Sequence, residues 1–262
     1  MKSTHYLNIN NQLNPNLSHK YCLNFINWFV GREKIARFFQ SFFFFLPFTD
    51  GEGCFQINNN KTKKRVSFPF AINLHLDDKN TLEYIQKNWG VGKIKLESHN
   101  NAVTYEITDY NCIKNIFIPI FDNYLLCTIK QWNFLKFKEA FLYKHPNKKL
   151  SNTDYNCILN IKSTINRGLD YNSNEIIHFY NNRILNITAY WLLGFIEAEG
   201  TLGVKNLFMY FQICEHSVSL ALLKSIKKFI VNIPITQYDL PLIKLKPNVT
   251  MALNKKQMFI LM

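Results

Sequence analysis

A short apolar pattern that ends in two acidic residues occurs twice in this chain, and this repeat restricts the possible folds more than any other sequence feature. The downstream copy is continuous, with the sequence WLLGFIEAEG at residues 191–200. The upstream copy lies in two pieces, WFVG at 28–31 and FTDGEG at 48–53, which match the downstream copy in residue character at nearly every position. Because similarity at domain-scale spacing marks a duplicated unit, we expect two similar halves.

The two pieces of the upstream copy are separated by sixteen residues, 32–47. In one interpretation a helix stays on 28–31 and the sixteen residues loop out. In another, residues 42–48 take over the apolar helix, and Pro47 then occupies the place of the small packing residue, where a proline costs about 3 kcal/mol or more. In a third, the segment is absent from the working protein.

Alternation of apolar and polar residues after each copy predicts β-strands. The longest run is 65–76, in which Pro69 predicts an edge position or a bulge. Asp77 and Asp78 can cap a following helix that stops at Gly90. One face of the long run is apolar, with Val66, Phe68, Phe70, Ile72, Leu74 and Leu76. The other predicted elements are strands near 54–58, 93–97, 102–108, 201–205, 208–214, 242–246 and 249–253, and helices near 129–141 and 220–229.

This order of elements predicts an α+β fold of two pseudo-symmetric αββαββα-like repeats. The second half has fewer residues after its motif than the first, so we expect the second repeat to be truncated at its C-terminal end. The predicted divisions are an N-terminal extension at 1–23, a first repeat at 24–150 with an insertion at 32–47, a linker at 151–186, and a second repeat at 187–262.

Composition narrows the class of protein. The net charge is +13 and the pI is about 9.4, which favours a polyanionic partner. No apolar run reaches the roughly 18 residues of a membrane span, and the N-terminus carries neither a signal core nor an Arg-rich presequence. The six cysteines lack metal-ligand spacing. Abundant Phe, Asn, Lys, Ile and Tyr use AT-rich codons, which predicts an organelle-encoded protein.

The two patterns resemble the LAGLIDADG signature, an apolar helix with a small residue midway that ends acid-small-acid-Gly. The resemblance extends from about Asn24 onward. It implies a homing endonuclease, encoded in a mobile intron and made in mitochondria, whose antiparallel sheets form a DNA-binding saddle. Such an enzyme makes a staggered cut in both strands of a long target and so promotes intron mobility.

The acids of the two patterns are the candidate catalytic residues. Two apolar helices that pack side by side need small residues where they approach most closely, and Gly31 and Gly194 are the candidates. Carboxylates at helix C-termini need a compensating cation, and magnesium suits oxygen ligands. The resemblance implies that the second acids, Glu52 and Glu199, bind the metal, and that Asp50 hydrogen-bonds locally near the helix end. It also implies metal contacts from the carbonyls of Gly51 and Ala198, a local hydrogen bond for Glu197, and a catalytic lysine in each half, for which Lys95 and Lys246 are the candidates.

Polar side chains on the outward strand faces are the candidate DNA contacts. Amide and basic groups on a sheet in the major groove can pair with base edges, whereas clustered lysines more often meet phosphates. The expected contacts in the first half are Gln56, Asn58, Lys61, Lys63, Lys64, Arg65, Ser67, Asn73 and Lys93. Those in the second half are Lys205, Tyr210, Gln212 and Lys244.

Three functions remain open from the sequence. The first is a monomeric, magnesium-dependent endonuclease whose partner is duplex DNA, with no membrane partner. The second is a maturase on the same fold that binds intron RNA. The third is a degenerate, inactive copy. Retention of both second acids favours the nuclease, whereas the interrupted first pattern and the short second repeat favour decay.

Overall fold

A computed structural model describes residues 45–97, 99–145, 148–181, 187–205, 208–232, 250–253 and 256–261, and the single residues 183 and 185. The predicted N-terminal extension, Gly31, Lys244 and Lys246 lie outside these residues. The side chains of Lys205 and Tyr210 also lie outside the described part. Among the described helices, none combines the length and the apolar character that a membrane crossing requires.

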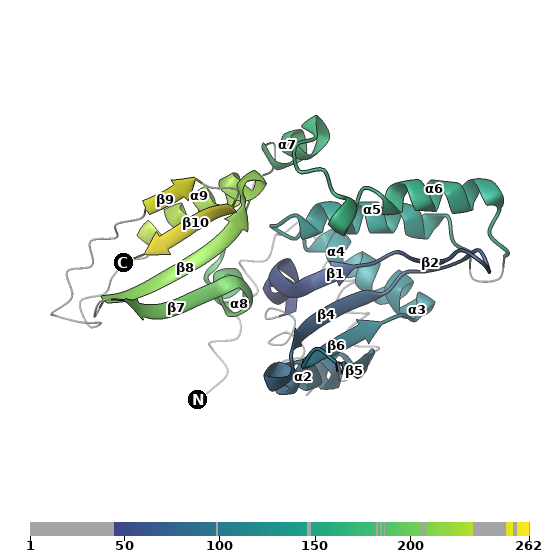
Figure 1. Ribbon diagram of the computed structural model, residues 1–262, viewed down its shortest axis with the longest axis horizontal. Coiled ribbons are helices and arrows are strands. Elements are labelled where there is room, and N and C mark those ends of the chain that lie inside the picture. Colours follow the sequence, from purple (N-terminus) through teal and green to yellow (C-terminus); the bar gives the residue numbers. More distant parts are fainter. Residues whose placement is uncertain are drawn as a thin grey trace, which may run out of the picture. The chain divides into compact units, whose positions relative to one another are not determined.

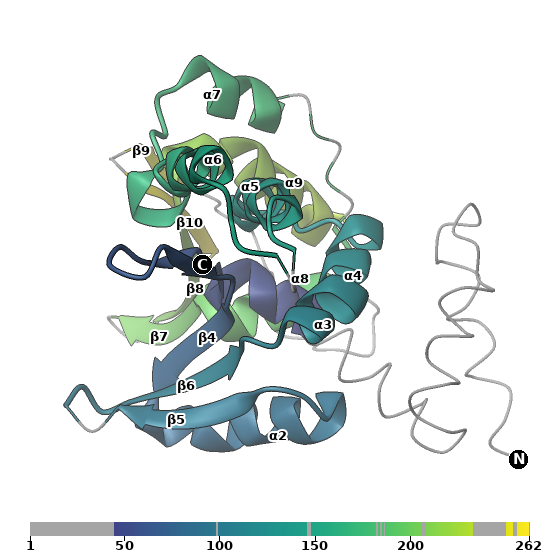
Figure 2. The ribbon, with the colours of Figure 1, turned by 90° about the vertical axis from the view of Figure 1, so that its right-hand side faces the viewer.

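The first repeat is built on a four-stranded antiparallel sheet (Figure 1). Its strand order is β1 (Gly53–Phe55), β4 (Phe70–His75), β6 (Ala102–Ile107) and β5 (Lys93–Glu97). The alternation of the sequence sets the two faces, because neighbouring side chains of a strand point to opposite sides. Phe70 and Ile72 are fully buried, whereas Asn73 is exposed. Helix α2 (Lys79–Trp89) joins β4 to β5 and packs on the sheet through Leu82, Ile85 and Trp89 (Figure 2).

The second repeat has the same topology. Its sheet has the order β7 (Gly200–Lys205), β8 (Phe208–His216), β10 (Lys256–Leu261) and β9 (Thr250–Leu253), which repeats the order of the first sheet strand for strand. Helix α9 (Leu220–Val231) follows β8 as α2 follows β4. The predicted α+β fold of two pseudo-symmetric repeats is confirmed. Of the last two predicted strands, 249–253 corresponds to β9, 242–246 lies outside the described residues, and β10 was not predicted.

Aromatic residues fill the core of the first repeat. The chain after β6 forms α3 (Tyr110–Cys112), a π-helical turn (Ile113–Phe117), α4 (Ile118–Asn123) and α5 (Lys130–Leu142). These helices bring Phe121, Phe134 and Phe137 against Phe55 of β1, at ring-centroid distances of 5.2, 5.4 and 5.5 Å. Burial of each such ring contributes about 1.5–3 kcal/mol to stability. The predicted helix at 129–141 is therefore α5, and its aromatic face holds β1 in place.

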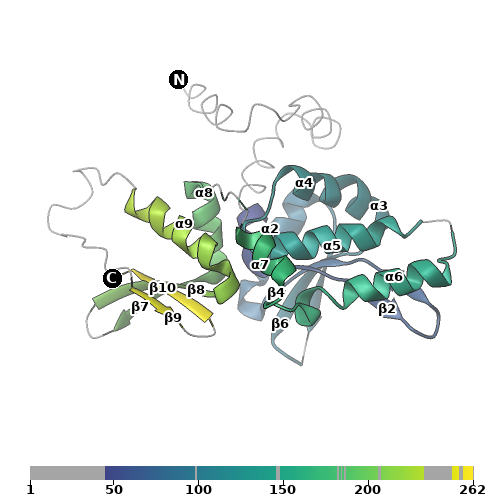
Figure 3. The same ribbon diagram turned by 90° about the horizontal axis from the view of Figure 1, so that it is seen from above.

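A short hairpin extends the first repeat beyond its sheet. It consists of β2 (Asn58–Asn60) and β3 (Arg65–Ser67), and the predicted continuous run is interrupted between β3 and β4 at Pro69, where we expected an edge position or a bulge. Helix α6 (Asn152–Lys162), in the segment that we assigned as the linker, lies beside this hairpin (Figure 3). Lys64 Nζ donates to Asn152 Oδ1 at 2.8 Å, and Lys162 Nζ donates to Asn59 Oδ1 at 2.6 Å. The linker thus supports the hairpin that carries the predicted phosphate contacts.

Two buried tyrosines provide a test of hydrogen bonding in the core. Tyr180 of α7 (Asn174–Asn181) is 1% exposed, and its hydroxyl has no hydrogen-bond partner among the described residues. Tyr105 is 0% exposed and donates to the Val91 carbonyl at 2.9 Å. We expect Tyr180→Phe to leave the free energy of unfolding unchanged or raise it by up to about 1 kcal/mol, and Tyr105→Phe to lower it by about 1–2 kcal/mol. Urea denaturation of both variants checks this, and equal losses would contradict it.

Candidate active site where the two motif helices meet

The two repeated patterns form helices that touch at their C-terminal ends. Residues 45–52 are helical, and the second pattern forms α8 (Ala189–Glu199). A Cβ atom added to Gly51 would lie 2.4 Å from Ala198 Cβ and 3.1 Å from Glu199 Cγ. No side chain fits in that space without a shift of one helix. The described contact therefore lies at Gly51 and Ala198, although Gly194, which we expected at the interface, is also buried.

The first motif helix includes the last three residues of the apparent insertion, 45–47. Of the arrangements left open by the sequence, the structure has residues 45–48 in the helix, with Pro47 buried. Phe45 and Phe48 are 0% and 4% exposed, and the ring of Phe45 lies 4.3 Å from that of Trp89. These buried rings explain why this apolar segment can take over the helix despite the proline.

The predicted metal-binding acids stand at the ends of these helices. Glu52 follows Gly51 directly, and Glu199 is the last residue of α8. Burial raises the pKa of Glu52, the charge of Glu199 raises it further, and Lys130 acts in the opposite direction. The two carboxylates thus repel each other across the helix contact, and a divalent cation between them would remove the repulsion. Within the described residues, no three His, Cys, Asp or Glu side chains converge as metal ligands, so the two acids and neighbouring carbonyls are the oxygen donors that magnesium would find.

Lys130 is a basic residue of the site that the sequence did not single out. It begins α5, and its charge lowers the pKa of Glu52. The predicted catalytic lysine, Lys95, lies instead on β5, where its side chain is 55% exposed and pairs with Glu106. A lysine at the second position of the helix predicted over 129–141 was the available signal, but the sequence did not show which end of this helix lies near the acids.

The second predicted catalytic lysine, Lys246, lies outside the described residues. Strand register gives an independent comparison of the two sheets. From Gly53 and Gly200, the pairing across the strands leads to Ile94 in the first sheet and to Met251 in the second, so the next residues, Lys95 and Ala252, correspond. The counterpart of Lys95 in the second sheet is therefore an alanine.

Asp50 holds the site together through contacts that are distant in sequence. Its carboxylate accepts hydrogen bonds from the backbone N–H groups of Cys127 and Thr128 at 2.9 and 2.8 Å, and from the Thr128 hydroxyl at 2.8 Å. Trp191 Nε1 of the other motif helix donates to it at 2.8 Å. We expected local hydrogen bonds for Asp50, and this expectation is wrong, because its partners lie 77, 78 and 141 positions away. Its counterpart Glu197 is exposed.

Glu215 is an acid near the motif helices that the sequence analysis did not single out. It lies near the end of β8, in the alternating position occupied by the buried Ile213, so it points towards the covered side of the sheet. Burial and then the charge of Glu199 raise the pKa of Glu215 to about 7, against a hydrogen bond from Ser219. The end of the second motif helix therefore faces a carboxyl group that titrates near neutrality.

Titration of Glu215 should appear in the pH dependence of stability. Because the pKa is raised from 4.5 to about 7, the folded protein binds more protons than the unfolded chain between these values, and the unfolding free energy falls as pH rises through this window. We expect Glu215→Gln to be more stable than the wild type by about 2 kcal/mol at pH 8 and equal to it at pH 4.5. Urea denaturation across this range checks the difference, with the exposed Glu83→Gln as control. A difference independent of pH would contradict the assignment.

The candidate DNA contacts of the first repeat lie on one face of the four-stranded sheet and on the hairpin. Asn73, Lys93 and Lys95 lie on the sheet face opposite the buried Phe70 and Ile72. Most of the remaining candidates belong to the hairpin and are exposed, namely Asn58, Lys61, Lys63, Lys64, Arg65 and Ser67. Gln56 is half-buried. Gln212 of the second repeat is also half-buried, and its side-chain amide donates a hydrogen bond to Cys214 Sγ at 2.7 Å. Their contacts with DNA stay a prediction.

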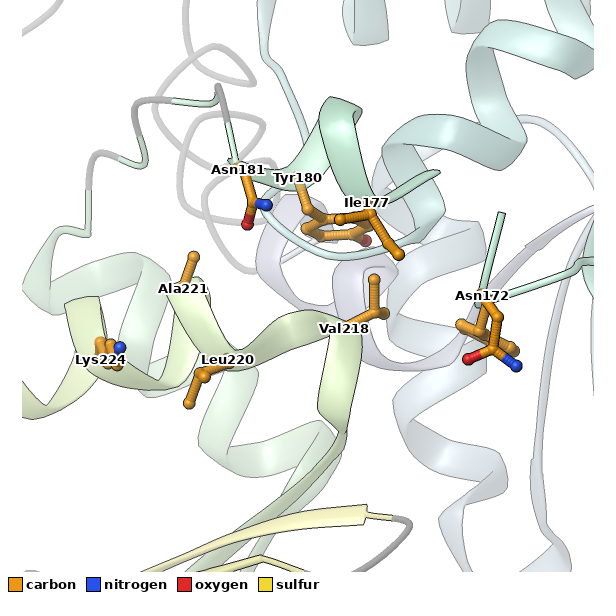
Figure 4. A pocket seen from close by; sticks show the side chains of 9 residues that line it. Asn172, Ile177, Tyr180, Asn181, Val218, Leu220, Ala221 and Lys224 are labelled. Atoms are coloured by element: carbon orange, nitrogen blue, oxygen red, sulfur yellow. The ribbon is translucent and has the colours of Figure 1, made fainter. Parts of the chain in front are cut away.

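A pocket of about 340 Å³ lies between α7 and the start of α9 (Figure 4). Ile177 and Tyr180 line it from the linker, and Val218, Leu220 and Lys224 line it from the second repeat. None of the predicted site residues borders this pocket, so it does not enter the functional argument.

Comparison with known proteins places these features in context. Residues 46–141 match a family model described as LAGLIDADG endonuclease. The uncharacterized mitochondrial protein RF1 of Saccharomyces cerevisiae is 32% identical over 216 residues, which cover 80% of this chain and 39% of that protein. A protein of Schizosaccharomyces pombe named "probable intron-encoded endonuclease Cox1-I1b" is 34% identical over 157 residues, covering 59% of this chain and 39% of that one. The chain thus spans about two fifths of the length of these relatives.

Solved structures share the fold. The meganuclease I-AabMI, bound to uncleaved DNA, is 26% identical with a TM-score of 0.64, and the match covers 84% of this chain and 78% of that one. The endonuclease I-LtrWI, bound to target DNA, is 22% identical with a TM-score of 0.67 over 86% of this chain and 78% of that one. The second likeness concerns the fold alone.

Proposed function

We propose that this chain, whose residues 46–141 match the LAGLIDADG endonuclease family, is a member of that family and a site-specific homing endonuclease that cuts both strands of duplex DNA. The observation that carries the proposal is the meeting of Glu52 and Glu199 at the ends of two helices in contact at Gly51 and Ala198. A pair of acids that repel each other in a partly buried place has no structural benefit and fits a cation-binding role. One chain supplies both acids, which supports action as a monomer.

Each residue of the site would have its own role in phosphodiester hydrolysis. Glu52 and Glu199 would hold divalent metal, with the carbonyls of Gly51 and Ala198 as neighbouring oxygens. Bound magnesium would supply an activated water and stabilise the leaving oxygen. Lys130, whose charge already acts on Glu52, would place a positive group beside the scissile phosphate. Lys95 and Lys246 remain weaker proposals for that role.

The surface of the first repeat is suited to hold DNA over this site. The hairpin places Lys61, Lys63, Lys64 and Arg65 in an exposed group, which fits phosphate contacts. Asn73 and Lys93 stand on the open sheet face, where amide and ammonium groups can reach base edges. A mitochondrial location agrees with the comparisons, since a relative is named a mitochondrial protein and others are named intron-encoded endonucleases. Intron mobility would follow from cutting an allele that lacks the intron.

A cleavage assay tests the proposal directly. The full chain is incubated with magnesium and fragments of mitochondrial DNA that lack the host intron, and the new DNA ends are sequenced. We expect a staggered cut at one long site and complete loss of cutting with a chelator. If folded protein cuts none of the fragments with magnesium, the nuclease proposal fails. Rescue of intron splicing by the same protein would then support the maturase alternative, and the absence of both activities would support a degenerate copy.

A further inference from the structure

The linker between the repeats contacts the candidate active site through one arginine. Arg183 follows α7 and directs its guanidinium at a short segment before α5, residues 126–128, which we call the strap. Arg183 donates to the carbonyl of Leu126 and, at 3.5 Å, to that of Thr128. Its guanidinium also lies 5.0 Å from the ring centroid of Phe179, and this cation–π contact stabilises the position of the guanidinium.

The strap is polarised between two opposite charges. Its residues are 1%, 7% and 1% exposed, so water cannot replace their hydrogen bonds. The carbonyls of the strap accept from Arg183, while the N–H groups of Cys127 and Thr128 donate to Asp50. The peptide between Leu126 and Cys127 is therefore aligned between the guanidinium and the carboxylate, which strengthens both hydrogen bonds in a place that excludes solvent.

The strap also connects Arg183 to the groups around Glu52. Asp50 belongs to the same helix two residues before Glu52, and Trp191 ties it to the other motif helix. At the other end the strap leads into α5, where the Lys130 N–H donates to the Thr128 hydroxyl at 3.3 Å. Any displacement of the strap would thus move Lys130 and the helix of Glu52 together.

We propose that Arg183 is a positioning residue for the cleavage reaction, which holds the strap so that Lys130 and Glu52 keep their relative placement. This inference rests on the proposed endonuclease function. It assigns the linker a part in catalysis besides that of joining the repeats, although Arg183 itself touches neither acid in the described contacts.

Two arginines of the linker allow a matched test. Arg183→Gln removes the guanidinium that contacts the strap, and Arg167→Gln removes the same charge from an exposed position in the same linker. We expect Arg183→Gln to lower the single-turnover cleavage rate constant about 10- to 100-fold with target Kd within about 3-fold, and Arg167→Gln to change neither. Arg183→Lys should restore part of the rate, because it keeps the charge and one donor but loses the planar fork.

A second measurement does not require activity. Hydrogen exchange of the peptide containing Cys127 and Thr128 should accelerate at least about 10-fold in Arg183→Gln, with exchange in β4 unchanged. Equal cleavage rates and equal strap exchange in the two glutamine variants would overturn the inference. If the wild-type protein cuts no DNA, the proposed function fails instead, and unchanged strap exchange in Arg183→Gln would independently show that Arg183 does not hold the strap.

Discussion

Glu52→Gln is expected to lower the rate of magnesium-dependent DNA cleavage by about 1,000-fold, which corresponds to about 4 kcal/mol of transition-state stabilisation. The amide is isosteric with the carboxylate but cannot supply the negative charge that holds a divalent ion. Glu199→Gln should have an effect of the same size, because the two acids hold equivalent places at the ends of the two motif helices. Single-turnover cleavage of the identified target site measures both.

Stability separates loss of chemistry from loss of fold in these variants. Burial and Glu199 both raise the pKa of Glu52, so its charge is unfavourable in the folded protein without metal. We therefore expect Glu52→Gln to raise the unfolding free energy at pH 8 while it lowers the cleavage rate by about 1,000-fold. Glu83→Gln, an exposed acid on α2, should cut at the wild-type rate. Retained cleavage in Glu52→Gln would remove this acid from the mechanism.

Asp50→Ala is expected to lower the free energy of unfolding by about 3–5 kcal/mol. Asp50 is 2% exposed, and the strap and Trp191 donate to its carboxylate. Removal of the carboxylate leaves two backbone N–H groups and an indole N–H without an acceptor in a place closed to water, while the Thr128 hydroxyl keeps the backbone carbonyl of residue 50 at 2.8 Å. Asp50→Asn, which keeps one acceptor oxygen, should lose about half as much. Urea denaturation of both variants measures the losses.

The second repeat contains a matched control for Asp50. Glu197 holds the same position in its pattern but is exposed. Glu197→Ala should change the unfolding free energy by less than about 0.5 kcal/mol. Equal losses in Asp50→Ala and Glu197→Ala would show that the strap contacts do not contribute to stability, and would weaken the case for Arg183 as well.

Much of the fold could be predicted from local sequence patterns. The alternation over 65–76 places Phe70 and Ile72 in the core and Asn73 outside, because strand residues have a period of two that burial on one face makes visible. The interruption of the strand at Pro69, where the sequence predicted an edge position or a bulge, agrees with the missing N–H of proline. The repeated pattern, once its two pieces were joined, predicted two repeats, and both sheets indeed have the same strand order.

The sequence by itself determined the duplicated fold and the two acids, because each leaves a mark within a short stretch of chain. The tertiary structure decided what surrounds those acids. The helix contact at Gly51, the charge of Lys130 beside Glu52, and the hold of the strap on Asp50 all join segments far apart in the chain. The strength of these contacts depends on burial and on the direction of single hydrogen bonds, and neither of them produces a repeating pattern of residues in the sequence.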